Sequence, residues 1–201
     1  MADDILSRAR EDIENSTYLA DRLAKLAGVV TTLFGENGHE LVVVGETALA
    51  LYTEGRCGSN VVDMSRTGDQ PIPLRLRQRL MAGMLDAVGG PRTYEGFGVR
   101  VHLVGRLEND AQSTLYTMQT AYGTISLIPP EQLLVERLVL ATFPVPDEEA
   151  ERSARELLSA ALSDRVQVDW EETRRLAADE RYNVRGPLAR IRSEVESELR
   201  G

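Results

Sequence analysis

The stretch Gly45-Glu46-Thr47-Ala48-Leu49-Ala50-Leu51, followed by Arg56 and by Ser59-Asn60-Val61-Val62-Asp63-Met64, decides the fold of this chain. A β-rich apolar run at 41–44 precedes it and predicts a short buried strand that ends at the glycine. The small and apolar residues after that glycine predict a short helix that can pack closely on the strand. The last part predicts a second strand, which carries the carboxylate of Asp63.

Helical periodicity precedes this stretch. Between residues 3 and 34, apolar side chains recur at intervals of three or four, at Leu19, Leu23, Leu26, Val30 and Leu33. The polar run 15–17 offers N-cap chemistry, so we expect it to divide a short first helix from a longer second one.

The middle of the chain predicts one more helix and three more strands. The helix is expected at 72–88, with two glycines directly after it. At 99–104, apolar and polar residues alternate, which is the pattern of a half-exposed strand, and His102 is one of its polar positions. Two further strands are expected at 115–121 and 124–128.

The rest of the chain predicts helices. An amphipathic helix begins at the two prolines 129–130 and ends near Phe143. Further helices are expected at 148–162, 170–179 and 187–199. We therefore expect an α/β core at 1–128 and a C-terminal helical part at 129–201.

Composition limits the function classes. The 201 residues are 42% hydrophobic and 27% charged, which is ordinary for a globular protein. The formal net charge of −9 argues against nonspecific nucleic-acid binding, because that affinity comes from Lys and Arg neutralising phosphates. With one cysteine, Cys57, and two histidines, His39 and His102, the sequence has no zinc-site spacing and no intramolecular disulfide.

The compartment is also expected from the sequence. The N-terminal residues are acidic where a signal peptide would be basic, and no run of about 18 apolar residues occurs. We expect a cytoplasmic protein that is neither exported nor membrane-spanning.

The order of these elements resembles the nucleotidyltransferase superfamily, whose fold is typified by the polymerase-β palm. The resemblance covers about residues 20–180 and is strongest to the minimal, abortive-infection or toxin-type branch. In that branch the deciding segment reads approximately G-G-x-A-L-x-L, a basic residue, then T-x-D-I-D-L. Here those places are taken by 45–51, Arg56 and 59–64. Downstream, 123–138 is similar to a strand, proline and helix that bear a phosphate-contacting Lys, and Arg137 takes that place.

The resemblance implies an α+β fold with a mixed β-sheet, helices on one face and a C-terminal helical part. We expect 41–44, 60–64 and 99–104 in one mixed sheet, backed by the helices around 17–34 and 73–88. It also implies Mg²⁺ and a nucleoside triphosphate as cofactor and substrate. The implied nucleotide-binding residues are Gly45, Glu46, Arg56, Ser59 and Arg137, and the implied catalytic residues are Asp63 and His102, with Asp63 as metal ligand.

The active-site motifs are degenerate. Two carboxylates two residues apart on a strand, with a third from a neighbouring strand, can hold two divalent ions about 4 Å apart. In this chain Val61 stands in place of the first carboxylate and His102 in place of the third, so Asp63 alone remains. Glu46 places a negative charge where a triphosphate would lie. Either the alignment is shifted by two residues, or Glu46 and Asp69 substitute, or two-metal transfer is lost.

Each candidate residue has a structural interpretation as well. Asp63 could end a strand, His102 could be a hydrogen-bonded cleft histidine, and Arg56 and Arg137 could be salt-bridge partners. Three functions stay open at this point. The first is a Mg²⁺-dependent nucleotidyltransferase or toxin that acts on protein, RNA or a small-molecule hydroxyl. The second is a silent pseudoenzyme that binds a nucleotide or a protein partner through the former cleft. The third is an interaction module that uses its C-terminal helices. We expect Asp63 and His102 to share one cleft with Glu46.

Overall fold

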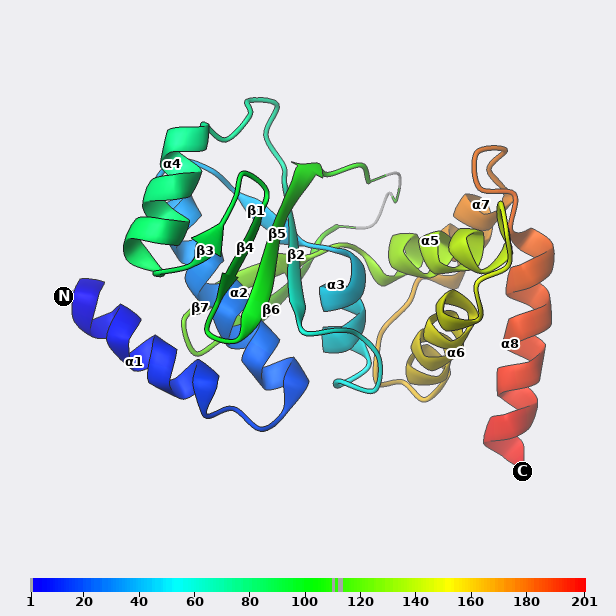
Figure 1. Cartoon of the computed structure of the whole chain (residues 1–201). Coiled ribbons are helices and arrows are strands. Elements are labelled where there is room, and N and C mark those ends of the chain that lie inside the picture. The colour runs from blue at the N-terminus through cyan, green and yellow to red at the C-terminus, as the bar shows by residue number, and fades with distance from the viewer. Residues whose placement is uncertain (1, 110, 112–113) are drawn as a thin grey trace.

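A computed structural model describes residues 2–109, 111 and 114–201. Its strands form one seven-stranded sheet in the order β3-β4-β5-β2-β1-β7-β6. Figure 1 shows this sheet in one half of the molecule, α5 to α8 in the other half, and α3 between them. The strands are β1 Leu41–Val43, β2 Val61–Arg66, β3 Val88–Gly89, β4 Thr93–Gly96, β5 Val99–Arg106, β6 Tyr116–Thr120 and β7 Gly123–Leu127.

The sheet is mixed, as predicted. Strand β1 pairs with β2 antiparallel and with β7 parallel, and β2 pairs with β5 parallel. The predicted strands 41–44, 60–64 and 99–104 therefore lie in one sheet. Within it, Asp63 on β2 is the direct neighbour of His102 on β5.

The helices fall into two groups, one in the half of the molecule that contains the sheet and one in the C-terminal half. The helices of the first half are α1 Ala2–Glu14, α2 Leu19–Gly35, α3 Gly45–Tyr52, α4 Leu74–Gln78 and the π-helical segment η1 Arg79–Met84. Those of the second half are α5 Pro130–Thr142, α6 Glu148–Leu162, α7 Trp170–Ala178 and α8 Arg185–Arg200. The α+β class with a C-terminal helical part is therefore confirmed.

Alternation along β5 fixes which face of the sheet is buried. Val99, Val101 and Leu103 are buried in the core, whereas Arg100 is exposed and His102 is half-buried. Because successive side chains on a strand point to opposite faces, His102 lies on the face opposite to this apolar set. Helix α2, which carries the largest group of buried apolar residues in the first half, packs against β1, β2 and β7.

Two local predictions are wrong. The helix expected at 72–88 ends with η1, and 88–96 form the β3–β4 hairpin instead. Gly89 there has a φ of 122°, and a Cβ on it would lie 2.6 Å from Thr93 O, so the hairpin needs a glycine at this place. The run 15–17 does divide α1 from α2, but its side chains do not cap α2, because the Ser16 hydroxyl bonds with the Asp12 carbonyl and the Asp21 carboxylate.

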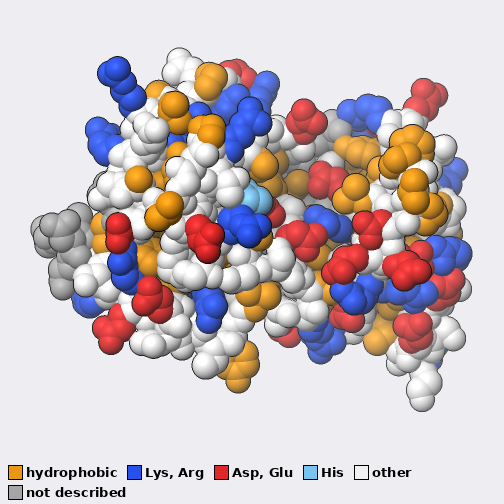
Figure 2. All heavy atoms as spheres, viewed as in Figure 1, with side chains coloured by type: hydrophobic (Ala, Val, Ile, Leu, Met, Phe, Trp, Pro, Cys, Tyr) orange, Lys and Arg blue, Asp and Glu red, His pale blue; other side chains and the backbone are white. Residues whose placement is uncertain are grey.

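The C-terminal helices are held by apolar packing and by surface ion pairs. Helix α5 packs against α6, α7 and α3, and α6 packs against α8. Arg155 on α6 pairs with Glu194 and Glu198 on α8. Figure 2 shows acidic and basic side chains interleaved over this half of the molecule. None of the described helices is both long and apolar enough to cross a membrane.

Candidate functional site

Asp63 and His102 form the centre of the candidate site. They face each other across β2 and β5, and Nδ1 of His102 lies 3.1 Å from Oδ1 of Asp63. The side chain of Asp63 is 16% exposed and that of His102 is 33% exposed, so solvent reaches the pair. The structure thus brings together the two residues that the sequence predicted as catalytic, while their roles stay predictions.

The start of α3 holds Asp63 in place. Thr47 is fully buried, its hydroxyl donates to the Val61 carbonyl at 2.9 Å, and it accepts the Asp63 backbone N–H at 2.7 Å. The Asp63 carboxylate accepts a hydrogen bond from the Glu46 backbone N–H. Helix α3 and strand β2 are therefore joined through both the main chain and the side chain of Asp63.

Gly45 makes room for this carboxylate. Its φ is 57°, and a Cβ at this position would lie 3.1 Å from Asp63 Oδ2. An L-residue disfavours that backbone conformation, and the side chain would crowd the carboxylate as well. The sequence predicted that Gly45 would let phosphates approach the backbone, whereas the group that approaches it in this structure belongs to Asp63.

Burial dominates the electrostatics of Asp63. It raises the pKa of the Asp63 carboxyl above its ordinary value of 3.8, although His102, the Glu46 N–H and the Arg137 guanidinium act in the opposite direction. A carboxyl held this way keeps its proton to higher pH than a solvated aspartate does.

Glu46 and Arg137 form the second pair of the site. Nη1 of Arg137 on α5 donates to Oε1 of Glu46 on α3. The Arg137 side chain is 11% exposed and that of Glu46 is 34% exposed. The Nε–H of Arg137 is buried and has no hydrogen-bond partner among the described residues. Arg137 is therefore held by Glu46 but retains an unused donor.

Arg56 and Ser59 lie on the loop between α3 and β2. Both are exposed, and neither side chain forms a hydrogen bond or ion pair with another described residue. The loop passes close to α3, since a Cβ on Gly58 would lie 3.0 Å from the Glu46 carbonyl oxygen. The structure therefore brings Gly58 of this loop to the first turn of α3, whereas the Arg56 backbone N–H bonds with the Thr53 carbonyl after the end of that helix, and neither Arg56 nor Ser59 is joined to Asp63 or Arg137.

Cys57 on the same loop is not activated. Burial raises the pKa of its thiol, and the negative charge of Glu156 adds to that effect. The positive charge that acts on it comes from Arg152. An idle thiol, rather than a nucleophile, is the interpretation that this environment supports.

The donor set fits two divalent ions poorly. Mg²⁺ prefers oxygen ligands in octahedral geometry, and at this place the chain offers one carboxylate, Asp63, beside the nitrogen of His102 and the apolar side chain of Val61. Glu46 is engaged by Arg137. Over 2–109, 111 and 114–201, no group of three or more His, Cys, Asp or Glu side chains could hold a metal ion.

Thr47 is the site residue that sequence reasoning missed. It lies inside the deciding stretch. No sequence pattern, however, distinguishes a helical threonine whose buried hydroxyl makes two hydrogen bonds from one whose hydroxyl is solvated. The only available signal was its place two residues after the strand-to-helix glycine.

Comparison with solved structures identifies the fold. The chain superimposes on an antigenic nucleotidyltransferase-like protein from Paracoccidioides brasiliensis with a TM-score of 0.57 and 16% identity, over 90% of this chain and 93% of that chain. The fold is that of nucleotidyltransferase-like proteins. The antibiotic-resistance factor ANT(2'')-Ia is also similar, with a TM-score of 0.45 and 14% identity over 87% of this chain and 95% of that one. No protein-family model and no curated protein matches the chain. The toxin-type branch stays a prediction.

Proposed function

We propose that this nucleotidyltransferase-fold protein is a pseudoenzyme that binds a nucleotide at the start of α3 and does not transfer it. The observation that carries the proposal is the pairing of Arg137 with Glu46, beside an Asp63 that is paired with His102. Four of the charged or titratable groups expected at the site, Glu46, Asp63, His102 and Arg137, are thus paired with one another, and Arg56 stays outside these pairs.

Arg137 supports the binding part of the proposal. A buried guanidinium with an unpaired Nε–H is suited to a phosphate oxygen, since arginine presents its donors in a rigid fork. Glu46 is one-third exposed, so its side chain can swing into solvent when a phosphate takes its place. In this structure, with Glu46 paired to Arg137, the carboxylate of Glu46 occupies the position that a phosphate would need.

The metal ligands that the site offers support the other part of the proposal, that the protein does not transfer the nucleotide. Charge that develops on a transferring phosphoryl group is stabilised mainly by metal ions and fixed cations. A single carboxylate at Asp63 cannot organise two metal ions, and Val61 supplies no ligand. Mg²⁺ would therefore reach this site chiefly as the companion of a bound triphosphate.

Nucleotide titration tests the proposal. We expect ATP to bind wild-type protein with little dependence on Mg²⁺, and Glu46→Gln to tighten binding about tenfold, because it removes a repelling charge and frees Arg137. Glu54→Gln is the matched control, since Glu54 lies just after the same helix but pairs with Arg165. Binding that is unchanged in Glu46→Gln, or absent in both proteins, would contradict the nucleotide proposal.

The alternative is an active Mg²⁺-dependent nucleotidyltransferase of the toxin type. The contact between Asp63 and His102 favours it, because a carboxylate beside an imidazole can orient a general base. Transfer from labelled ATP to the protein itself, to RNA or to a small hydroxyl compound distinguishes the two functions. We expect Asp63→Ala to change that transfer less than about tenfold. Turnover that falls by orders of magnitude in this variant would establish the enzyme.

A further inference from the structure

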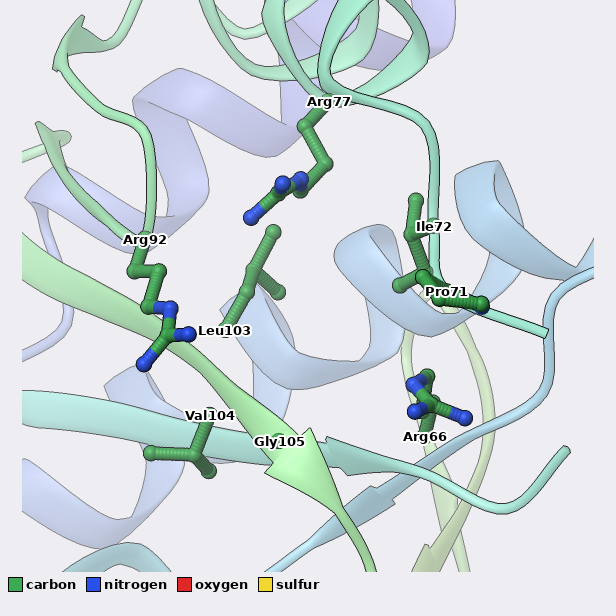
Figure 3. A pocket seen from close by; sticks show the side chains of 8 residues that line it. All are labelled: Arg66, Pro71, Ile72, Arg77, Arg92, Leu103, Val104 and Gly105. Carbon is green, nitrogen blue, oxygen red and sulfur yellow. The ribbon is translucent and has the colours of Figure 1, made fainter. Parts of the chain in front are cut away.

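A second candidate site, lined by arginines, lies at the carboxyl end of β5. A pocket of about 250 Å³ opens there between β2, β5, the segment leading into α4 and the turn of the β3–β4 hairpin. Its lining is three arginines, Arg66, Arg77 and Arg92, with Pro71, Ile72, Leu103, Val104 and Gly105. Figure 3 shows the arginines entering from three separate segments, with Leu103 and Ile72 between them.

These arginines have no carboxylate partners in the part of the chain that the structure describes. Among the described residues, Arg66, Arg77 and Arg92 form no ion pair, and the lining contains neither Asp nor Glu. Asp69, close to Arg66 in the chain, pairs with Arg106 instead. In a chain with a net charge of −9, three unneutralised arginines around one pocket concentrate positive potential where an anion can be enclosed.

The backbone holds two of the three guanidinium groups in place. Nη1 of Arg77 donates to the Pro91 carbonyl at 2.7 Å, and Nη1 of Arg66 donates to the Gly68 carbonyl. The Nε–H of Arg77 is buried and has no partner among the described residues. Since a guanidinium has five donors, most of the donors of both arginines are left for a ligand.

We propose that this pocket binds the phosphoryl group of a small phosphorylated molecule. Three guanidinium groups match the oxygens of a phosphate dianion, with which arginine forms charge-assisted, bidentate hydrogen bonds. Pockets for drug-sized ligands measure about 300–1,000 Å³, so this one suits a phosphate with a small organic group rather than a dinucleotide. Ile72, Leu103 and Val104 supply the apolar wall for that group.

A small ligand fits better than a nucleic acid. Polyanion affinity grows with the number of phosphates neutralised, and this patch offers three arginines on a strongly acidic protein. The pocket shares no residue with the pairs Asp63–His102 and Glu46–Arg137, so the inference is independent of the function proposed above.

Calorimetric titration of the full chain at low ionic strength tests this site, with ribose 5-phosphate, ribose, inorganic phosphate and a short single-stranded DNA as probes. We expect ribose 5-phosphate to bind and ribose not to bind. Arg92→Gln and Arg77→Gln should weaken binding about tenfold or more. Arg75→Gln is the matched control, because Arg75 is exposed on the same helix as Arg77 and does not line the pocket.

The probes and variants also separate the competing explanations. Inorganic phosphate binding as tightly as ribose 5-phosphate would assign the pocket to the free ion, and weaker binding would assign it to an ester. Arg92 is exposed, so Arg92→Gln should fold even if Arg77→Gln does not. The proposal would be overturned if ribose 5-phosphate did not bind at about 1 mM, or if Arg75→Gln weakened its binding as much as the pocket variants do. It would also be overturned if Asp63→Ala weakened that binding, or if DNA bound more tightly with the same dependence on the arginines.

Discussion

At the candidate site Arg137 is buried against the carboxylate of Glu46, whereas the pocket arginines Arg66, Arg77 and Arg92 have no carboxylate partner among the described residues. The first arrangement satisfies the protein's own charges and holds α5 against α3. The second leaves charge unsatisfied at a hollow in the surface. An arginine contributes to anion binding only with the charge that its own protein leaves free, so a place expected from a family pattern can bind less readily than one that no motif marks.

The comparison also separates structural from binding residues. The candidate site is tied into the fold through Thr47, Gly45 and Asp63, which join α3 to β2. The pocket is assembled from the ends of β2 and β5, the segment before α4, Arg77 on α4 and the turn of the β3–β4 hairpin. We therefore expect substitutions at Thr47, Gly45 and Asp63 to cost stability, and substitutions of the pocket arginines to cost ligand affinity.

The largest effect on stability is expected at Thr47. Thr47→Val removes a buried hydroxyl and leaves the Asp63 N–H and the Val61 carbonyl without their partner, which costs about 2–4 kcal/mol of unfolding free energy. Urea denaturation measures this cost. Thr47→Ser keeps the hydroxyl and should lose clearly less. Equal losses in the two variants would mean that the methyl group contributes as much as the two hydrogen bonds, and a larger loss in Thr47→Ser would contradict the prediction.

A smaller effect is expected from the arginines, and it differs between the two regions. Arg137→Gln breaks a mostly buried pair, but Glu46 can hydrate, so the loss should be about 2 kcal/mol. Arg92→Gln, at an exposed residue that has no carboxylate partner among the described residues, should change stability by less than about 0.5 kcal/mol. Denaturation of both variants under one condition tests the contrast. Similar losses in the two variants would contradict the expectation that Arg137 contributes more to stability than Arg92 does.

Much of the fold could be predicted because its signals are local. The alternation at 99–104 identified the exposed face of β5, and the prolines at 129–130 marked the start of α5. The facing of Asp63 and His102 followed from strand positions once β2 and β5 were taken as neighbours. Helical periodicity also misled, because the apolar spacing of η1 continues to Leu85 and concealed the β3–β4 hairpin.

The Glu46–Arg137 pair and the grouping of the pocket arginines could not be predicted, because they join distant parts of the chain. Glu46 and Arg137 are separated by 91 residues, and each was expected to affect a triphosphate rather than the other. The pair gives Arg137 a structural role that the motif does not indicate. The three arginines of the pocket come from separate segments and form no spacing that a sequence pattern could reveal.

The smallest effect is expected from the protonation of Asp63. Burial raises the pKa of its carboxyl in the folded state, so the folded protein binds this proton more tightly than the unfolded chain does. The groups that face this carboxyl are His102, the Glu46 N–H and Arg137, and all three favour the ionised form. They reduce the shift without reversing it. Stability contributed by the bound proton is present at low pH and is lost as the pH rises from 3.8 through the folded pKa.

Asp63→Asn tests that sign, because asparagine cannot ionise. The unfolding free energy of the variant, relative to wild type, should increase as the pH rises through this window and stay constant above it. The Asp179 carboxyl is the internal reference, since Arg181 holds its pKa at about 2 on the surface. Carboxyl chemical shifts followed by NMR should place Asp63 above 3.8 and Asp179 well below it. If Asp63 titrated below 3.8, its ion pairing with His102 would outweigh burial, and the site would hold a permanent negative charge available to a cation.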